Sequence, residues 1–221
     1  MTFTDNIPEV VKRLKLVDAF KGYNPGVLDC IEVSRDSQIM IVDDAKGTCI
    51  SKREADAYRC CLCINPTSSE IVLLPLDKRL IKQRAGGMAD GAIFDEQKFV
   101  FLEFKDQAKG NYQTSVEGTY KKASSQLSAA LQLFIEILAT NSICVDFLSN
   151  INVSCHIIVS DKFPRVSALE QNMRLLFSMK NHGVELSFEK KIFFGRFTNS
   201  HAGSGGEYKT RKTNNNEQEI Q

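Results

Sequence analysis

The segment that most constrains the fold is 88–105, where two apolar runs flank the polar stretch 95–98. Two such runs joined by four polar residues predict an antiparallel β-hairpin. Pairing around this loop places Asp90 directly opposite Glu103. Side chains alternate between the faces of a strand, so Lys105 joins both carboxylates on one face.

Opposed carboxylates in a hairpin repel each other, at a cost of roughly 0.2–1 kcal/mol, unless a cation lies between them. Magnesium is usually held by one or two carboxylates together with waters and substrate phosphates. Asp90 and Glu103 are therefore sufficient for a divalent metal site. Lys105 would lie beside the attacking water, where a positive charge favours deprotonation and offsets charge on a phosphate.

An alternative interpretation of the same residues needs no metal. Asp90-Gly91 is also a common turn dipeptide, and Glu103 and Lys105 would then lie on a solvated sheet face. We favour the metal site because 95–98 is the better loop. The metal-site assignment would fail if either carboxylate were buried in an ion pair, or if the two lay farther apart than one ion can bridge.

The remaining elements follow from hydrophobic periodicity and predict an α/β fold with a central mixed β-sheet flanked by helices. Helices are expected over 7–20, 52–61, 118–141 and 167–180, and strands over 38–42, 71–76, 88–94, 99–105, 153–160 and 184–194. We divide the chain into an N-terminal extension packed on the core (1–50), the core (51–197) and a flexible polar tail (198–221).

Composition excludes several classes of protein. Hydrophobic residues make up 43% of the chain, and no apolar stretch approaches the roughly 20 residues needed to cross a bilayer. The first twenty residues lack the apolar core of a secretory signal. Seven cysteines, an odd number, indicate reduced thiols and a cytoplasmic location. The net charge of +1 provides no overall basic field, so contact with nucleic acid would depend on local patches such as Lys78, Arg79 and Lys82.

At Asp90 and at Glu103-Phe104-Lys105 the chain resembles the PD-(D/E)XK nuclease superfamily, which includes restriction endonucleases and Holliday junction resolvases. The resemblance implies a restriction-endonuclease-like core over 51–197. It also implies Mg²⁺ or Mn²⁺ bound by Asp90, Glu103 and the backbone carbonyl of Phe104, with Lys105 positioning or activating the attacking water. Ala89 replaces the proline of the nominal motif.

Two further residues follow from the same resemblance. Gln126, in the helix after the hairpin, matches a glutamine of the RecB-like branch, although the tyrosine expected four residues later is Ala130. Gln126 would face either the substrate or water. Many members use an acidic residue from the helix before the hairpin, and Glu54 is the nearest candidate. A surface glutamate is the commoner explanation for Glu54.

The resemblance implies a metal-dependent nuclease that hydrolyses DNA phosphodiester bonds in DNA processing, restriction or defence. Nucleic acid, with DNA favoured, is the expected partner, no membrane is involved, and a homodimer is compatible with cleavage of two strands. The alternative is a catalytically inactive nuclease-fold protein that acts as a nucleic-acid or protein binding module. Near-neutral net charge favours this alternative.

Overall fold

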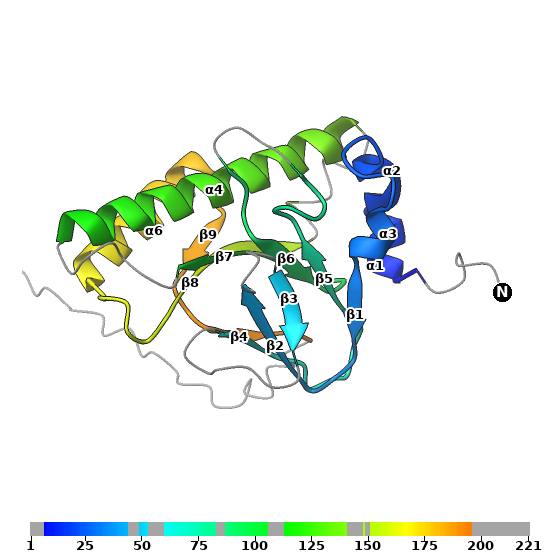
Figure 1. Cartoon of the computed structure of the whole chain (residues 1–221), viewed down its shortest axis with the longest axis horizontal. Coiled ribbons are helices and arrows are strands. Elements are labelled where there is room, and N and C mark those ends of the chain that lie inside the picture. Colours follow the sequence, from blue (N-terminus) through cyan, green and yellow to red (C-terminus); the bar gives the residue numbers. More distant parts are fainter. Residues whose placement is uncertain are drawn as a thin grey trace, which may run out of the picture.

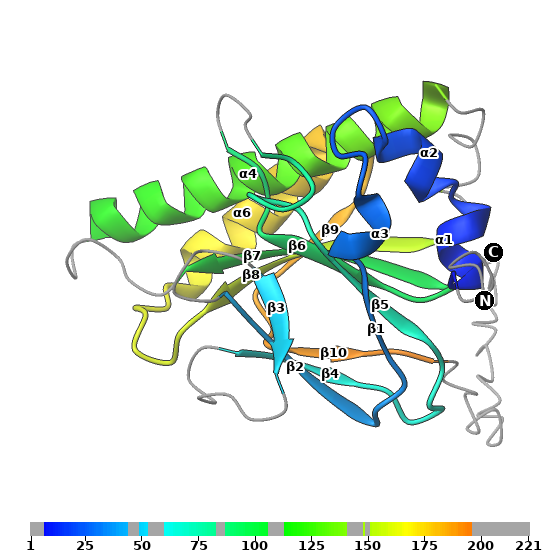
Figure 2. The ribbon, with the colours of Figure 1, turned by 45° about the vertical axis from the view of Figure 1, so that its right-hand side comes forward.

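A computed structural model describes residues 7–43, 49–52, 60–82, 87–105, 113–140, 148 and 151–195. The chain is layered around a central sheet (Figures 1 and 2). Helices α4 (Gln113–Thr140) and α6 (Ser167–Lys180) lie on one side of this sheet, and a second, smaller sheet lies on the other. The expected polar tail over 198–221 is outside the described residues.

The central sheet has six strands and mixed direction. In spatial order they are β1 (Glu32–Ser34), β5 (Ile71–Pro75), β6 (Gly91–Phe94), β7 (Lys98–Lys105), β8 (Asn152–Val159) and β9 (Glu185–Ser187). Adjacent strands among the first four run antiparallel to one another, whereas β8 runs parallel to β7 and β9 parallel to β8. Helix α4 connects β7 to β8, as a parallel crossover requires. The predicted α/β class with a central mixed sheet is confirmed.

The second sheet was only partly predicted. Its four strands, in spatial order, are β10 (Lys191–Phe193), β4 (Cys60–Ile64), β2 (Gln38–Asp43) and β3 (Cys49–Lys52). Of these, only β2 was expected as a separate strand. The predicted strand 184–194 is divided between β9 and β10, which belong to different sheets, because the chain crosses between the layers at 188–190.

The helix predicted over 52–61 is wrong at both ends. Lys52 ends β3, while Cys60 and Cys61 begin β4. Cys61 and Cys63 are buried in the core of the second sheet, so this segment follows the two-residue period of a strand. Residues 53–59, which include Glu54, lie outside the described residues.

The other helices agree closely with the periodicity. Helix α4 begins at Gln113, earlier than predicted, and α6 has the predicted bounds. The predicted opening helix is two helices, α1 (Glu9–Arg13) and α2 (Leu16–Phe20), because Lys15 between them has a left-handed φ of 45°. They still bury one apolar side against α4, and a short helix α3 (Val27–Cys30) follows.

Strand β7 separates two hydrophobic cores. Phe99 and Phe101 pack against Phe134 of α4, with ring centroids 5.4 and 5.1 Å apart. The core between the two sheets contains the residues that alternate with them along β7: Val100, Leu102 and Phe104. This alternation matches the faces predicted from the sequence and leaves Glu103 and Lys105 on the α4 side.

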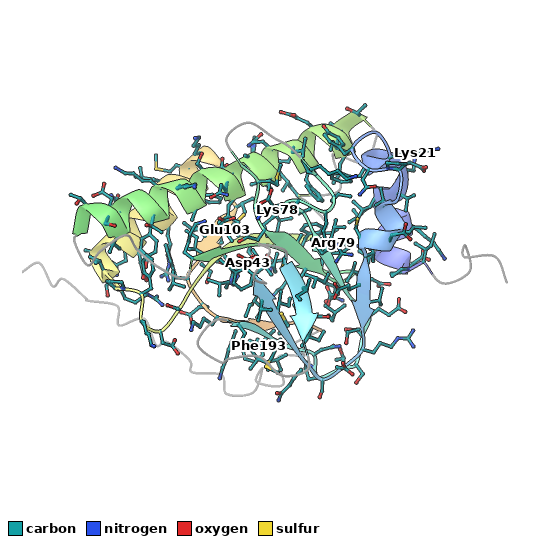
Figure 3. All side chains as sticks on the ribbon, viewed as in Figure 1. Lys21, Asp43, Lys78, Arg79, Glu103 and Phe193 are labelled. Atoms are coloured by element: carbon teal, nitrogen blue, oxygen red, sulfur yellow. The ribbon has the colours of Figure 1, made fainter. Side chains whose placement is uncertain are left out.

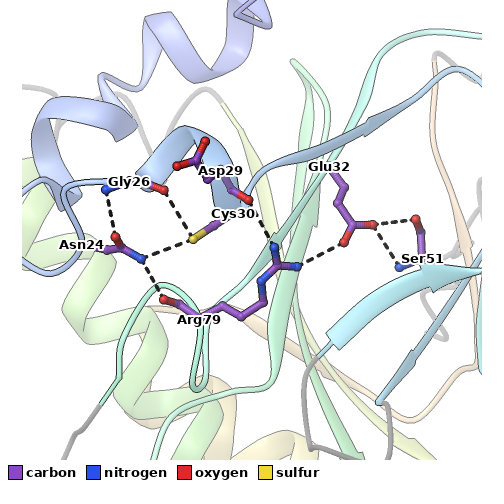
Figure 4. Close-up of polar contacts among 7 residues, drawn as sticks. All are labelled: Asn24, Gly26, Asp29, Cys30, Glu32, Ser51 and Arg79. Atoms are coloured by element: carbon purple, nitrogen blue, oxygen red, sulfur yellow. Dashed lines mark hydrogen bonds and ion pairs between the residues drawn. The ribbon is translucent and has the colours of Figure 1, made fainter.

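A polar network joins the second sheet to the central one (Figure 4). Glu32 of β1 accepts hydrogen bonds from the hydroxyl and amide of Ser51 in β3, at 2.7 and 3.2 Å. Its other carboxylate oxygen lies 3.4 Å from Arg79, which also donates to the carbonyl of Asp29. Arg79 belongs to a basic patch expected to contact phosphates. Its guanidinium instead links the segment at Asp29 to strand β1, which in turn binds β3.

The thiols also agree with the sequence. All six cysteines among the described residues are free and buried. They behave as small apolar core residues rather than as a disulfide framework. None of the helices in the described part of the chain is long and apolar enough to cross a membrane.

Candidate metal site on the central hairpin

The β6–β7 hairpin has the predicted register. Gly91 pairs with Leu102 and Phe94 with Phe99, so the next pair along the ladder is Asp90 with Glu103. The turn is fixed by Asp95, whose Oδ1 accepts hydrogen bonds from the amides of Gln97 and Lys98, each at 2.8 Å. An aspartate that caps its own turn explains why this loop sets the register.

Asp90 is buried just before β6, with 9% of its surface exposed. Its Oδ2 accepts a hydrogen bond of 2.6 Å from the amide of Phe104. Burial raises the pKa of the Asp90 carboxyl to about 7, and the negative charges of Asp43 and Asp77 add to the rise. The Phe104 amide and the Lys105 ammonium oppose it. At neutral pH this carboxyl is therefore poised to exchange a proton for a cation.

Glu103 is completely buried. Its Oε1 accepts a hydrogen bond from the Lys105 ammonium, whereas its Oε2 has no hydrogen-bond partner among the described residues. Burial and the charge of Asp90 hold the pKa of Glu103 well above its usual range, and Lys105 and the backbone amide of Asp90 only partly offset them. A buried carboxylate oxygen without a partner is costly, and it is the kind of atom that binds a metal ion.

Gln126 of α4 belongs to the same cluster. Its Oε1 accepts a hydrogen bond of 3.3 Å from Lys105, and its Nε2 donates to the carbonyl of Met88 at 3.2 Å. Gly87, with a φ of +82°, lies against it, since a Cβ there would be 3.0 Å from Gln126 Nε2. Of the two orientations left open by the sequence, Gln126 takes the one that faces the site.

Asp43 is a further carboxylate whose charge acts on Asp90, and the sequence did not predict this. It ends β2 in the second sheet, and its charge raises the pKa of Asp90. Figure 3 shows it beneath Glu103, at the end of β2 that approaches β6 and β7. The polar pair Asp43-Asp44 after an apolar strand was the available signal, but the contact between the sheets was not predictable from periodicity.

The Glu103–Lys105 contact is a buried ion pair, so it meets the first of the two conditions set against the metal-site assignment. It occupies only one oxygen of Glu103, and one ammonium cannot neutralise both Glu103 and Asp90. In the described ranges, no three His, Cys, Asp or Glu side chains converge closely enough to hold a metal ion. A metal here would be held by two carboxylates and by waters, as magnesium commonly is.

Two other lysines form ion pairs with acidic side chains. Lys121 pairs with Glu117 at 2.6 Å, and Lys190 with Asp161 at 2.5 Å. Lys78 and Lys82, in the connection that leads to Asp90, have exposed side chains. These two are the predicted basic residues best placed to meet a phosphate chain near the site.

Comparison with known proteins adds no assignment, since no protein-family model, curated protein or solved structure matches this chain.

Proposed function

We propose that this protein is a metal-dependent nuclease that hydrolyses DNA phosphodiester bonds, with Asp90 and Glu103 binding Mg²⁺ or Mn²⁺. The observation that carries the proposal is the buried Oε2 of Glu103, which lacks a partner among the described residues and lies beside a second carboxylate. Two buried like charges are unfavourable by several kcal/mol without compensation. A divalent cation supplies that compensation, and the oxygen-only donor set suits Mg²⁺ or Mn²⁺.

The chain's own residues prepare the reaction geometry. The amide of Phe104 fixes Asp90, and Lys105 fixes Glu103 while Gln126 steers the ammonium. Lys105 would place its positive charge against the attacking water and the phosphate, and the Phe104 carbonyl is proposed as a further metal ligand. When bound, the metal would act as a Lewis acid on the phosphate and lower the pKa of the attacking water.

DNA is the proposed substrate, with the exposed Lys78 and Lys82 as backbone contacts. Binding would weaken with salt, as expected when lysines displace counterions from phosphates. A homodimer would place two sites on the two strands of a duplex. Helix α6 exposes Leu175, Leu176 and Met179, an apolar surface that a second copy would cover.

Cleavage of single-stranded, duplex and branched DNA with Mg²⁺ or Mn²⁺ tests the proposal. Wild type is compared with Glu103→Gln and Lys105→Ala, with Glu185→Gln and Lys191→Ala as controls at exposed positions. We expect both site variants to lose at least about 10²–10³-fold in rate, because each removes a charge that would act on the metal or on the phosphate. EDTA should abolish cleavage. Retained activity in either site variant with unchanged folding would refute the assignment.

The second candidate is the catalytically inactive nuclease-fold protein acting as a nucleic-acid or protein binding module. Lys105 already forms an ion pair with Glu103, and the described residues contain no three-ligand metal cluster. Both findings favour this candidate. It predicts no cleavage and no metal-induced rise in melting temperature, together with salt-dependent DNA binding measured by fluorescence anisotropy.

A further inference from the structure

We propose that Lys122 of α4 binds a backbone phosphate of the nucleic-acid strand whose scissile phosphate lies at the β6–β7 hairpin, and that it directs this strand along α4. The ligand is a phosphodiester chain, contacted through its charge and without regard to base sequence. This inference rests on the proposed function, because it needs the reacting phosphate at Asp90 and Glu103. It adds a contact from a second element to those proposed for Lys78 and Lys82.

The orientation of α4 over the hairpin is fixed by Gln126. Its side chain accepts a hydrogen bond from Lys105 at 3.3 Å and donates one to the Met88 carbonyl at 3.2 Å. Residues four positions apart on a helix are neighbours on its surface, with Cβ atoms about 5–6 Å apart. Lys122 therefore lies one turn from Gln126 on the same flank of α4, which is the flank that borders the site.

The turn that carries Lys122 lies toward the carboxyl end of β7. Helix α4 connects β7 to β8, and because these strands are parallel, the helix runs back over the sheet in the opposite direction (Figures 1 and 2). Moving from Gln126 toward the start of α4 thus leads outward past Lys105, the last residue of β7. Side chains on a helix also tilt toward its N-terminus. Lys122 is thereby placed near the edge at which open α/β sheets bind ligands.

The two flanks of α4 differ in charge. On the flank toward α6, Lys121 forms an ion pair of 2.6 Å with Glu117 and borders a hollow between the two helices. On the flank toward the site, four polar residues follow helical spacing: Ser115, Thr119, Lys122 and Gln126. None of the four is acidic, and Lys122 is exposed without an ion-pair partner among the described residues. A solvated cation on a flank without acids favours a negatively charged ligand.

Lys122 also meets a charge requirement of the hairpin. When ionised, Asp90 and Glu103 place two negative charges beside the single ammonium of Lys105, so the hairpin alone repels a phosphate chain. A bound metal reverses this at the scissile phosphate, whereas the neighbouring phosphates need cations of their own. Successive phosphates of one strand are about 3.4 Å apart along a duplex axis, and one helical turn spans about 5.4 Å. Lys122 consequently meets a phosphate about one or two nucleotides from the scissile one.

Fluorescence anisotropy of a labelled oligonucleotide, measured over a range of salt concentrations with Ca²⁺ as the divalent cation, tests the inference. Wild type is compared with Lys122→Ala, Lys122→Arg and Lys121→Ala. We expect Lys122→Ala to lower the slope of log K against log salt by about 0.7–0.9, and the affinity roughly fivefold at about 0.1 M salt, because one phosphate contact is lost. Lys122→Arg keeps the charge and should match wild type. Lys121→Ala should also match it, since this adjacent lysine lies on the other flank.

A second measurement locates the contact. Oligonucleotides that carry one uncharged methylphosphonate are compared, with its position counted from the linkage that wild type cleaves with Mg²⁺. Wild type should lose affinity when the neutral linkage is about one or two nucleotides from the cleaved one. Lys122→Ala should be insensitive to that same substitution, because the charge pair is already missing. Equal sensitivity of the two proteins at every position would refute the contact.

The outcomes separate the inference from the proposed function. If both alanine variants weaken binding equally, the effect is one of general surface charge and the inference is wrong. If neither variant changes the slope while wild type cleaves DNA, the nuclease proposal stands and Lys122 is not a phosphate contact. If wild type neither binds nor cleaves DNA, both are overturned. Circular dichroism checks folding, and Lys122→Gln provides a second neutral variant that should repeat the result of Lys122→Ala.

Discussion

Two buried glutamates in this protein each form an ion pair, yet their surroundings differ. Glu170 of α6 uses both oxygens: Arg165 donates to each of them, and the Tyr120 hydroxyl donates to Oε1 at 3.0 Å. Glu103 of β7 has Lys105 on one oxygen and no hydrogen-bond partner for the other among the described residues.

The difference indicates which buried charge has a structural role. A guanidinium fork satisfies a carboxylate completely, and burial raises the pKa of Tyr120, so its hydroxyl keeps the proton that it donates. Glu170 therefore joins α6 to α4. At Glu103 a point-charge ammonium leaves an oxygen and a negative charge uncompensated. Such under-satisfied buried groups occur preferentially at functional sites.

The largest expected effect comes from the burial of the Asp90 carboxyl, which lies opposite Glu103. Folded Asp90 keeps its proton up to a pKa of about 7, whereas the unfolded chain releases it near 3.8. Without metal, stability should therefore fall as pH rises from about 4 to about 7, by up to about 4 kcal/mol at about 1.4 kcal/mol per pH unit. Asp90→Asn should remove the part of this fall that Asp90 contributes, as measured by urea unfolding in EDTA at several pH values. The raised pKa of Glu103 should leave a residual fall in the variant.

Parallel stability curves for wild type and Asp90→Asn would contradict that expectation. Excess Mg²⁺ provides a further check, because a cation that binds only the folded protein should restore stability to wild type at pH 8 and leave the variant unchanged.

A smaller effect on stability should distinguish the roles of Glu170 and Glu103. Glu170→Ala leaves the buried Tyr120 hydroxyl without its acceptor and should cost about 2–3 kcal/mol. Because Arg165 is 45% exposed and can be rehydrated, we do not expect the larger loss of a fully buried pair. Glu103→Gln should be neutral or stabilising without metal, since it removes repulsion with Asp90. Thermal unfolding of both variants in EDTA measures the contrast, and a greater loss in Glu103→Gln would reverse our interpretation.

The smallest effect concerns the support of Lys105 by Gln126. Gln126→Ala removes hydrogen bonds to Lys105 and to the Met88 carbonyl, and should cost about 1 kcal/mol of stability. Cleavage should fall about tenfold with little change in metal affinity, because the ammonium loses its orientation rather than its charge. Gln132→Ala on the same helix is the matched control. Equal cleavage rates in the two variants would show that Gln126 does not position Lys105.

Local chemistry made the hairpin predictable. The Asp95 turn and the alternating apolar residues of β7 fix the register without distant contacts, so the opposition of Asp90 and Glu103 followed from sequence. The helical period of α4 also depends only on nearby residues. The orientation of its side chains could not be predicted in the same way, because Gln126 faces the site only where α4 packs over β7. Glu54, the acid suggested by the predicted helix 52–61, lies outside the described residues.

The sequence by itself determined the central hairpin, the long helices and the pair of opposed carboxylates, because each depends on neighbours within a few residues or across one turn. Only the tertiary structure decided the second sheet, in which β10 joins β4 from more than a hundred residues away along the chain. That sheet packs Cys49 against Gly91, next to Asp90 in the chain. Packing of this kind depends on shape and distance between layers, which no periodicity in the chain records.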